Sequence, residues 1–501
     1  MKRLGIIDIG SNSIRLLLVE ILSSGSYKII DELKESVRLG ADMIDGIRLN
    51  EERITKAIWT IKSFKIYCDA VHVKEIIAIA TEAVRRSENK NDFIERVKIE
   101  TDIEIRILTG VEEAYYDYFG VTNSMYIDNS LIVDIGGSST ELAWVYNNKL
   151  MESISIPIGA VNLTQKFNLE DIVNYLNEEK LREYLISIFN EIPWLFKVKF
   201  SSITGIGGTA RNLGKIDRKN KRYVLDIHHN YEMEMSDVHT IYNSIKSKGL
   251  KQRKRIDGLS EDRADIFVGP CCAILSLLQL LEIDKIFISG KGLREGILYE
   301  YITTHYTPIE DVLDFSIKNV MQHHYVNQPH ALNVYKLTSL LFENLKPLHH
   351  LNGDFSRIIK TATLLHDCGL SIRYYDHHKH SFYIILNSEI NGLSHKELIL
   401  SAYTASAHCD GQCDMNIFQF HGIINKMDLV NVEKIGCLLR IAESLDKSMS
   451  GLVKDILFTI ENDSVTLKVI SDHDIELEVN DAQKSASFFS EVYDRQLLIT
   501  T

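Results

Sequence analysis

The sequence lacks long hydrophobic runs, and none of its apolar stretches approaches the roughly 18 residues that a membrane-spanning helix needs. We therefore expect no membrane partner. The chain enters a strand pattern almost at once, at Leu4, so we also expect no signal peptide. Its seven cysteines are scattered and odd in number, a usage that fits the reducing cytoplasm better than a disulfide framework.

Positive charge is also scarce. The 56 Lys and Arg residues are outnumbered by 69 Asp and Glu residues, which gives a net charge of −13. Such a protein repels polyanions as a whole, so we expect no nucleic-acid partner, and a local site has to hold any anionic substrate. The densest basic run contains Lys251, Arg253, Lys254 and Arg255. A solvated loop is its default interpretation, and contact with a phosphate chain is the alternative.

The chain length of 501 residues predicts about two to four domains. Up to about Tyr301, short buried strand patterns alternate with longer amphipathic stretches, which predicts α/β architecture. From about Pro308 to Lys454 the patterns are helical, so this part is expected to be all-α. In the tail, residues 456–462, 464–471 and 474–480 alternate like strands and residues 481–498 look helical. We expect domains at residues 1–125, 126–304, 305–453 and 454–501.

One short pattern occurs twice in the α/β part. Residues 4–16 read LGIIDIGSNSIRL and residues 131–142 read LIVDIGGSSTEL. Each copy has a buried strand, an Asp near its end, a Gly break and small hydroxyl residues. Backbone N–H groups in such a turn form a nest for phosphate oxygens. The phosphate-binding candidates are Gly10, Ser11, Asn12 and Ser13 in the first copy, and Gly136, Gly137, Ser138, Ser139 and Thr140 in the second.

The Asp of each copy has a different predicted role. Asp8 and Asp134 cannot bind phosphate directly, because like charges repel. A carboxylate at this position instead suits a hydrated Mg²⁺ that bridges to phosphate. Two such loops facing each other would clamp one phosphate group and its metal from both sides.

The duplicated motifs resemble the phosphate loops of the actin, sugar-kinase and heat-shock ATPase fold. Further segments are similar to signatures of the exopolyphosphatase and guanosine pentaphosphate phosphohydrolase (Ppx/GppA) family. This resemblance implies duplicated actin-like, ribonuclease H-like α/β domains, followed by an all-α domain similar to the HD fold and a small α+β tail. The segments are residues 80–89, 107–121, 155–164, 205–216, 263–275 and 288–300.

The resemblance also implies roles for individual residues. Family members place a water-activating Glu in the position of Glu112 or Glu113; we favour Glu112, and a helix N-terminal carboxylate is the alternative for either one. Glu141 would order water or the metal, Mg²⁺ or Mn²⁺, together with Asp134. Arg85 has the right type for a phosphate contact, although a surface arginine is the alternative. Further cleft-lining candidates are Gly207, Gly208 and Thr209.

One residue departs from the family pattern. Family members usually carry a third Gly in the second loop, where this chain has Ser138. Serine is small but restricts the backbone more than glycine does. We expect the loop to tolerate it, with some change in geometry.

The resemblance implies removal of the terminal phosphate from inorganic polyphosphate by a cytoplasmic homodimer. Two alternatives remain open: hydrolysis of guanosine pentaphosphate at the same site, and a non-enzymatic sensor of polyphosphate or an alarmone. The acidic residues at positions 8, 112, 134 and 141 favour the enzymes. An ATP-dependent sugar kinase is a weaker competitor, because no sugar-recognition motif stands beside the loops.

The helical part carries a second set of candidates. His330, the pair His366–Asp367, and Asp446 form a series that resembles the HD superfamily of metal phosphohydrolases. The resemblance implies a second divalent-metal site in a helical bundle, and a regulatory unit with hydrogen-bonded histidines is the alternative. Between them lie His377, His378 and His380. The spacing of His408, Cys409 and Cys413 does not match a recognised zinc pattern.

Overall fold

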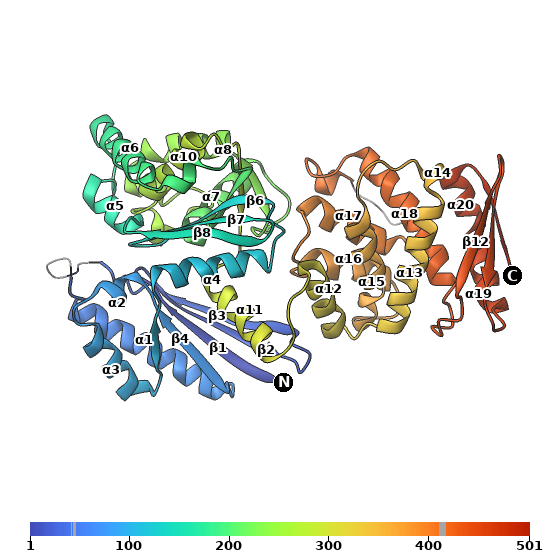
Figure 1. The fold of residues 1–501 in the computed structure, drawn as a ribbon, viewed down its shortest axis with the longest axis horizontal. Coiled ribbons are helices and arrows are strands. Elements are labelled where there is room, and N and C mark those ends of the chain that lie inside the picture. Colours follow the sequence, from blue (N-terminus) through green and yellow to red (C-terminus); the bar gives the residue numbers. More distant parts are fainter. Residues whose placement is uncertain (42, 44–46, 410–416) are drawn as a thin grey trace. The chain divides into compact units, whose positions relative to one another are not determined.

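The structure is a computed structural model that describes residues 1–41, 43, 47–409 and 417–501. The chain separates into two compact units, Met1–Val312 and Leu313–Thr501. The first unit contains two β-sheets and the second is mainly helical, in agreement with the sequence patterns (Figure 1). Among the described helices, none combines the length and the apolar character that crossing a membrane requires.

The two sheets of the first unit share one topology. The first has the strand order β3-β2-β1-β4-β5, and five strands of the second repeat it as β8-β7-β6-β9-β11, with β10 added beside β11. This repetition confirms the duplicated α/β architecture. The strands are β1 (Lys2–Ile9), β2 (Ile14–Ile21), β3 (Tyr27–Glu35), β4 (Glu75–Ala80), β5 (Ile105–Ile107), β6 (Asn129–Ile135), β7 (Thr140–Tyr146), β8 (Lys149–Ile156), β9 (Ser202–Ile206), β10 (Tyr231–Glu234) and β11 (Lys285–Ile288).

The central strands were predictable because they are buried on both faces. In β1, Leu4, Ile6 and Ile7 are all fully buried, which produces a continuous apolar run rather than an alternating one. The sequence patterns did not predict strands β5, β8 and β10. Strand β5 has only three residues, and the residues of β8 are mostly exposed or half-buried. Strands β5 and β8 therefore lack an extended run of apolar residues.

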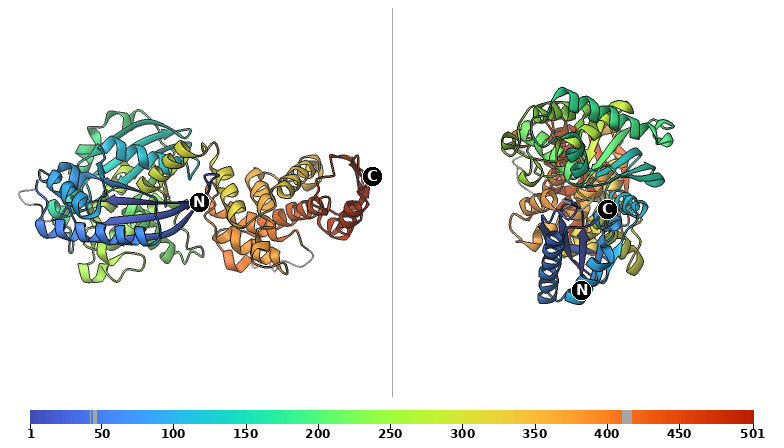
Figure 2. Two further views of the ribbon diagram at one scale, coloured as in Figure 1. Left: turned by 90° about the horizontal axis from the view of Figure 1, so that it is seen from below. Right: turned by 90° about the vertical axis from the view of Figure 1, so that its left-hand side faces the viewer.

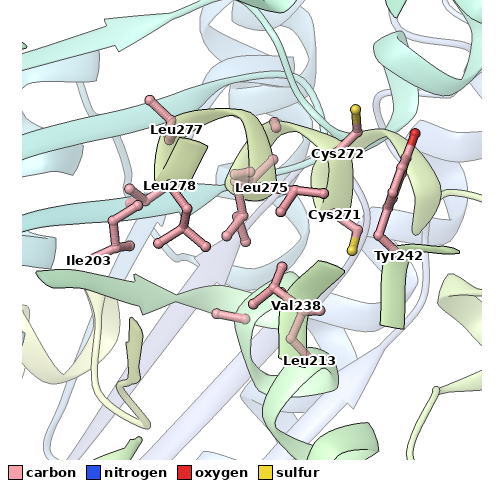
Figure 3. Packing of buried hydrophobic residues seen from close by; sticks show 14 of the residues in the cluster. Ile203, Leu213, Val238, Tyr242, Cys271, Cys272, Leu275, Leu277 and Leu278 are labelled. Carbon is pink, nitrogen blue, oxygen red and sulfur yellow. The ribbon is translucent and has the colours of Figure 1, made fainter. Parts of the chain in front are cut away.

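Helices cover both sheets. Helices α1 and α3 pack together beside the first sheet (Figures 1 and 2). In the second lobe, Leu275 and Leu278 of α10 share a core with Ile203 of β9 and Leu213 of α7 (Figure 3). The helices of this unit are α1 (Glu51–Ala70), α2 (Glu82–Arg86), α3 (Lys90–Thr101), α4 (Gly110–Thr122), α5 (Ala160–Phe167), α6 (Tyr175–Asn190), α7 (Gly207–Asn220), α8 (Met235–Lys246), α9 (Leu250–Arg253), α10 (Val268–Leu280) and α11 (Leu293–His305).

Helices α4 and α11 cross at very short range. A Cβ atom on Gly120 would lie 2.4 Å from the Gly292 carbonyl oxygen, and one on Gly296 would lie 2.0 Å from the Tyr116 carbonyl oxygen. Only glycine permits this approach of two backbones. Helix α4 also packs on β7 and β8 of the second sheet. The crossing therefore fixes the C-terminal half of α4 against the first turns of α11.

The second unit joins the helical bundle and the tail through one core. Leu337 of α13 and Leu438 of α18 lie in the same apolar cluster as Ile456 of β12 and Leu467 of β13. The elements are α12 (Val312–His323), α13 (Gln328–Asn344), α14 (Lys346–His349), α15 (Ser356–Leu365), α16 (His377–Asn387), α17 (His395–Ser406), α18 (Lys426–Ser444), β12 (Asp455–Ile460), β13 (Ser464–Ile470), α19 (Glu476–Gln483), α20 (Ala486–Tyr493) and β14 (Gln496–Thr500).

Part of the tail was predicted wrongly. Residues 474–480 were expected to form a strand, but most of them belong to α19. The buried positions Ile475, Glu478, Ala482 and Ser485 recur every three or four residues, so packing against α18 follows the helical period and overrides the local alternation. The expected helix at 481–498 is also interrupted, because its last residues enter β14 and pair in parallel with β13.

The basic run at 251–255 does not form a uniformly solvated loop. Arg253 is fully buried, and its guanidinium donates hydrogen bonds to the carbonyl oxygens of Ile245, Leu169, Glu170 and Asp171 at 2.6–3.2 Å. Its role is therefore to satisfy buried backbone acceptors. The other basic residues of the run, Lys251, Lys254 and Arg255, are exposed.

We predict that Arg253→Ala lowers the free energy of unfolding by about 3 kcal/mol, since it leaves several buried carbonyl groups without donors. Lys251→Ala, two residues earlier and exposed, is the matched control and should change stability by less than about 0.5 kcal/mol. Urea denaturation of both variants measures the difference. Equal midpoints for the two variants would contradict the structural role of Arg253.

Candidate active site

The two copies of the repeated motif form the same turn. The Gly10 N–H donates to the Ser13 carbonyl oxygen at 3.1 Å, and the Gly136 N–H donates to the Ser139 carbonyl oxygen at 2.9 Å. Each turn joins two antiparallel strands, β1 to β2 and β6 to β7. The backbone of each copy is therefore held by its sheet, and its geometry does not depend on a ligand.

The two turns lie against each other. A Cβ atom on Gly137 would lie only 2.9 Å from the Ser11 Cβ atom, so a larger residue at position 137 would push the turns apart. Asp8 and Asp134, near the ends of β1 and β6, line one pocket together with both turns. The structure thus brings the two copies of the repeated motif to a single site.

Most of the predicted site residues line this pocket. Of the described candidates, Ser138, Thr140, Thr209, Arg85 and Glu112 lie outside the pocket lining. Thr140 instead donates a hydrogen bond to the Ile158 carbonyl oxygen at 2.6 Å. The predicted residues in the lining are Asp8, Gly10, Ser11, Asn12, Ser13, Glu113, Asp134, Gly136, Gly137, Ser139, Glu141, Gly207 and Gly208.

The two adjacent glutamates of α4 have different surroundings. Glu112 is a helix cap: its carboxylate accepts hydrogen bonds from the Thr109 N–H and hydroxyl at 2.7 and 2.9 Å, and it also pairs with Arg106. Glu113 is buried and lines the pocket. Our preference for Glu112 is therefore corrected in favour of Glu113, because the first turn of the helix directs only Glu113 into the site.

Arg85 forms an ion pair with this glutamate. Its guanidinium pairs with the carboxylates of Glu113 and Glu82, and it donates to the Leu108 carbonyl oxygen at 2.6 Å. With its donors engaged in this way, Arg85 fixes the position of the Glu113 carboxylate. The phosphate contact predicted for Arg85 stays a prediction, and the contacts described here are with protein groups alone.

Five carboxylates line the pocket: Glu113, Asp117 and Glu141 are buried, and Asp8 and Asp134 are half-buried. Burial raises the pKa of Glu113 to about 7, despite the opposing effect of Arg85. Burial likewise raises the pKa values of Asp8 and Asp134, and those of Asp117 and Glu141 lie well above their usual range. Repulsion from the neighbouring carboxylates adds to the effect of burial on Asp117 and Glu141. A cluster of five carboxylates in one pocket favours the binding of a cation.

Four arginines complete the lining: Arg294 is buried, and Arg15, Arg211 and Arg263 are half-buried. Burial lowers the pKa of Arg211 to about 10, and it also lowers the pKa values of Arg15 and Arg263. Arg294 remains paired with Glu295 and Glu32. Sequence reasoning missed these residues because it sought a dense basic run. The signal was present in the motifs themselves, since Arg15 is the last residue but one of the first repeat and the other three lie in segments 205–216, 263–275 and 288–300.

A third glycine turn supports the site from β9. Gly207 has a φ of +73°, and a Cβ atom there would lie 2.2 Å from Oδ1 of Asp134. A Cβ atom on Gly208 would lie 2.0 Å from the Arg263 guanidinium carbon. Both glycines are therefore needed so that one anion and one cation reach the pocket beside the start of α7.

The donor set fits a hydrated divalent cation. Asp8, Asp134 and Glu141 supply carboxylate oxygens, which are the ligands that Mg²⁺ prefers. Within the described residues, Oδ1 of Asp117 and both polar side-chain atoms of Asn12 are buried without a hydrogen-bond partner. Such atoms need a polar partner in the pocket, and a cation with its water and an oxyanion would provide it.

The structure also brings together three of the four predicted metal ligands of the helical unit. Ligand atoms of His330, His366 and Asp367 lie within 4.8 Å of one another. The fourth, Asp446, is not part of this group. Its Oδ2 accepts a hydrogen bond from Nδ1 of His330 at 2.8 Å. Asp446 therefore orients a histidine rather than joining the group.

A second group, which the sequence disfavoured, lies beside the first. Ligand atoms of His377, His408 and Cys409 are within 4.8 Å of one another. Cys413 lies outside the described residues, and neither group includes His378 or His380. The sequence could not have revealed this group, because its members come from α16 and from the segment after α17.

Comparison with known proteins gives this site a context. The model of the Ppx/GppA phosphatase family matches residues 18–305, and the model of domain III of the same family matches residues 312–484. The chain belongs to the Ppx/GppA phosphatase family. Phosphatases of this family generally depend on a divalent metal, in agreement with the acidic pocket.

Related proteins cover nearly the whole chain. A protein of Pseudoalteromonas atlantica named guanosine-5'-triphosphate,3'-diphosphate pyrophosphatase is 27% identical over 447 residues, which are 87% of this chain and 86% of the relative. A protein of the same name from Pseudoalteromonas translucida is 26% identical over 475 residues, 93% of this chain and 92% of the relative.

Two solved structures resemble this chain over about three fifths of its length. An exopolyphosphatase from Cytophaga hutchinsonii is 27% identical with a TM-score of 0.58, over 61% of this chain and 100% of its own. A Ppx/GppA family member from Aquifex aeolicus is 30% identical with a TM-score of 0.54, over 61% and 99%. These matches confirm the actin-like Ppx/GppA fold.

We predict that Glu113→Gln lowers the turnover number by about 10²- to 10⁴-fold, because the amide cannot accept a proton. Glu112→Gln is the matched control: glutamine also serves in a capping box, so activity should stay within about threefold of the wild type. Phosphate release under saturating substrate measures both variants. Loss of turnover in Glu112→Gln alone would reverse the assignment.

Proposed function

We propose that this protein is an exopolyphosphatase, which removes the terminal phosphate of inorganic polyphosphate. The observation that carries the proposal is the pocket in which two facing glycine turns, four arginines and the buried Glu113 converge. Cations and backbone donors suit the charge of a phosphate chain end, and a carboxylate with a raised pKa suits proton transfer.

The residues divide the reaction between them. Backbone N–H groups of the turns at Gly10 and Gly136, with Arg211 and Arg263, bind the oxygens of the terminal phosphate. Glu113 accepts a proton from a water molecule whose oxygen attacks the terminal phosphorus. The bond between that phosphorus and the bridging oxygen breaks, and a polyphosphate shorter by one unit leaves with the bridging oxygen. Binding and orientation thus supply most of the catalysis.

Asp8, Asp134 and Glu141 would hold a Mg²⁺ or Mn²⁺ ion in this scheme. Such an ion neutralises charge on the phosphate oxygens and removes the repulsion between the carboxylates and the substrate. Glu141 is held for this role by the Ser155 hydroxyl, which donates to its Oε1 at 2.8 Å. The proposed enzyme acts in the cytoplasm as a homodimer, and gel filtration of the purified chain tests the dimer.

A second candidate function is hydrolysis of guanosine pentaphosphate at the same site. It is favoured by the two Pseudoalteromonas relatives, whose name states activity on guanosine-5'-triphosphate,3'-diphosphate and which match most of this chain. The third candidate, a non-enzymatic sensor, would use the same pocket for binding alone.

The substrates can be separated by one experiment. With Mg²⁺ present, phosphate release from long-chain polyphosphate, guanosine pentaphosphate and ATP is measured side by side. We expect the highest kcat/KM with polyphosphate. A higher value with guanosine pentaphosphate would assign the second function, and binding without release from any of the three would leave the sensor.

We predict that kcat/KM falls as the pH drops below about 7, because Glu113 then takes up the proton that disables it as a base. Arg85 lowers the pKa of Glu113, so Arg85→Gln should move this acidic limb to higher pH. Rate profiles between about pH 5.5 and about pH 9 measure the shift. An acidic limb that is the same in both proteins would contradict the role of Arg85.

A further inference from the structure

A second pocket adjoins the candidate active site beside α7. We call it the α7 pocket, and its volume is about 220 Å³. Four residues, Gly208 and three of the arginines, line both pockets, so the two spaces share one wall. No acidic side chain is among the described residues that line the α7 pocket. Its six basic lining residues are Arg15, Lys34, Arg211, Lys215, Arg218 and Arg263.

Helix α7 supplies half of these basic residues. Arg211, Lys215 and Arg218 are spaced by four and three residues, so they lie on one face of the helix. Like charges at this spacing repel each other and disfavour the helix. The first turn of α7 contains no acidic residue, so its backbone N–H groups add to the positive potential. The pocket is therefore positive in a protein whose net charge is −13.

Most of these cations lack a carboxylate partner. Among the residues that the structure describes, Arg15, Arg211, Lys215 and Arg263 form no ion pair with an acidic side chain. Repulsion from Arg15 adds to the effect of burial in lowering the pKa of Arg211. Of the basic residues that line the pocket, Lys34 is paired at 2.6 Å, with Asp262. A group of close cations without counter-charges favours the binding of an anion.

Arg218 shows the same need at a buried position. Its side chain is 6% exposed, and its Nη1 is buried without a hydrogen-bond partner within the described part of the chain. Asp226 lies 3.5 Å from that atom, and its own side chain is 88% exposed. A buried guanidinium donor without an acceptor is costly, so an anion in the pocket would stabilise it.

The lining also indicates which kind of anion fits. The remaining lining residues are Gly208, Asn212, His228 and Ser260, so no Phe, Tyr, Trp or aliphatic side chain is among those described. A nucleoside base needs a flat or apolar surface on which to stack. Guanidinium and ammonium groups instead bind phosphate oxygens, and guanidinium groups can do so with two parallel hydrogen bonds. A row of cations therefore suits a row of phosphate units.

We propose that the α7 pocket binds the phosphate units that follow the terminal one, and that it makes the site selective for linear polyphosphate. This inference rests on the proposed exopolyphosphatase function. The arginines of the shared wall contact the units next to the cleaved bond. Lys215 and Arg218, which line the α7 pocket but not the candidate active site, contact units farther along the chain.

Binding to the Glu113→Gln variant tests the proposal without hydrolysis. Adding Lys215→Gln should weaken the Kd for long-chain polyphosphate about tenfold, because one charged phosphate contact is lost. Adding Lys215→Glu should weaken it further through repulsion. Orthophosphate is a single unit that occupies the terminal position, so its Kd should change by less than about twofold. Isothermal titration calorimetry with Mg²⁺ present measures each value.

Lys219→Gln is the matched control, because Lys219 is an exposed lysine of the same helix that does not line the pocket. It should leave the Kd for polyphosphate within about twofold of the starting value. The salt dependence gives a second measurement that structural damage would not change. By analogy with counterion release from nucleic acids, Lys215→Gln should lower the slope of log Kd against log salt concentration by about one.

Three results would overturn the proposal. One is an equal Kd for polyphosphate in the Lys215→Gln and Lys219→Gln variants, and another is a loss of orthophosphate binding as large as that of polyphosphate. The third is a larger loss for guanosine pentaphosphate than for polyphosphate, which would assign the pocket to the nucleotide. Failure of the proposed function is distinguishable: the wild type would release no phosphate from polyphosphate, while its binding would still depend on Lys215.

Discussion

Repulsion between carboxylates clustered in one pocket is the constraint on which the first unit depends. Asp8, Asp117, Asp134, Glu113 and Glu141 share one pocket, and burial raises the pKa of each. Such a group would separate if its backbone allowed it. Glycine contacts oppose this separation: the two turns touch, and helices α4 and α11 cross through their glycines. The packed core supplies the stability that the charges remove, and the charges in turn give the site its affinity for a cation.

The duplication preserves the order of five strands in each sheet, but the chemistry of the two copies differs. In the first copy Asp8 pairs across the strands with Arg15, whereas in the second Asp134 pairs with Glu141. One repeat therefore brings a cation to the position where the other brings an anion. A site with both can hold an anionic substrate and a metal ion together, which two identical repeats could not do.

Local pattern was enough for the fold class and for much of the site. The apolar runs before Gly10 and Gly136 are strands because both faces are covered, and the turn residues follow from the Gly break. Prediction failed where packing decided. Residues 474–480 alternate like a strand but pack with a helical period against α18, and the arginines of the pocket are scattered so widely that no basic run marked them.

The sequence by itself determined the repeated motifs, the mixed α/β and helical halves and the types of residue available for chemistry, because these depend on the order of side chains along the chain. Tertiary structure alone decided which of two neighbouring residues faces the pocket. Glu112 and Glu113 are adjacent and identical, yet the first turn of α4 sends one to Thr109 and Arg106 and the other into the pocket. His377 and His408 meet only because α16 and α17 pack together. Distance in space between residues far apart in sequence is a property of the packed chain.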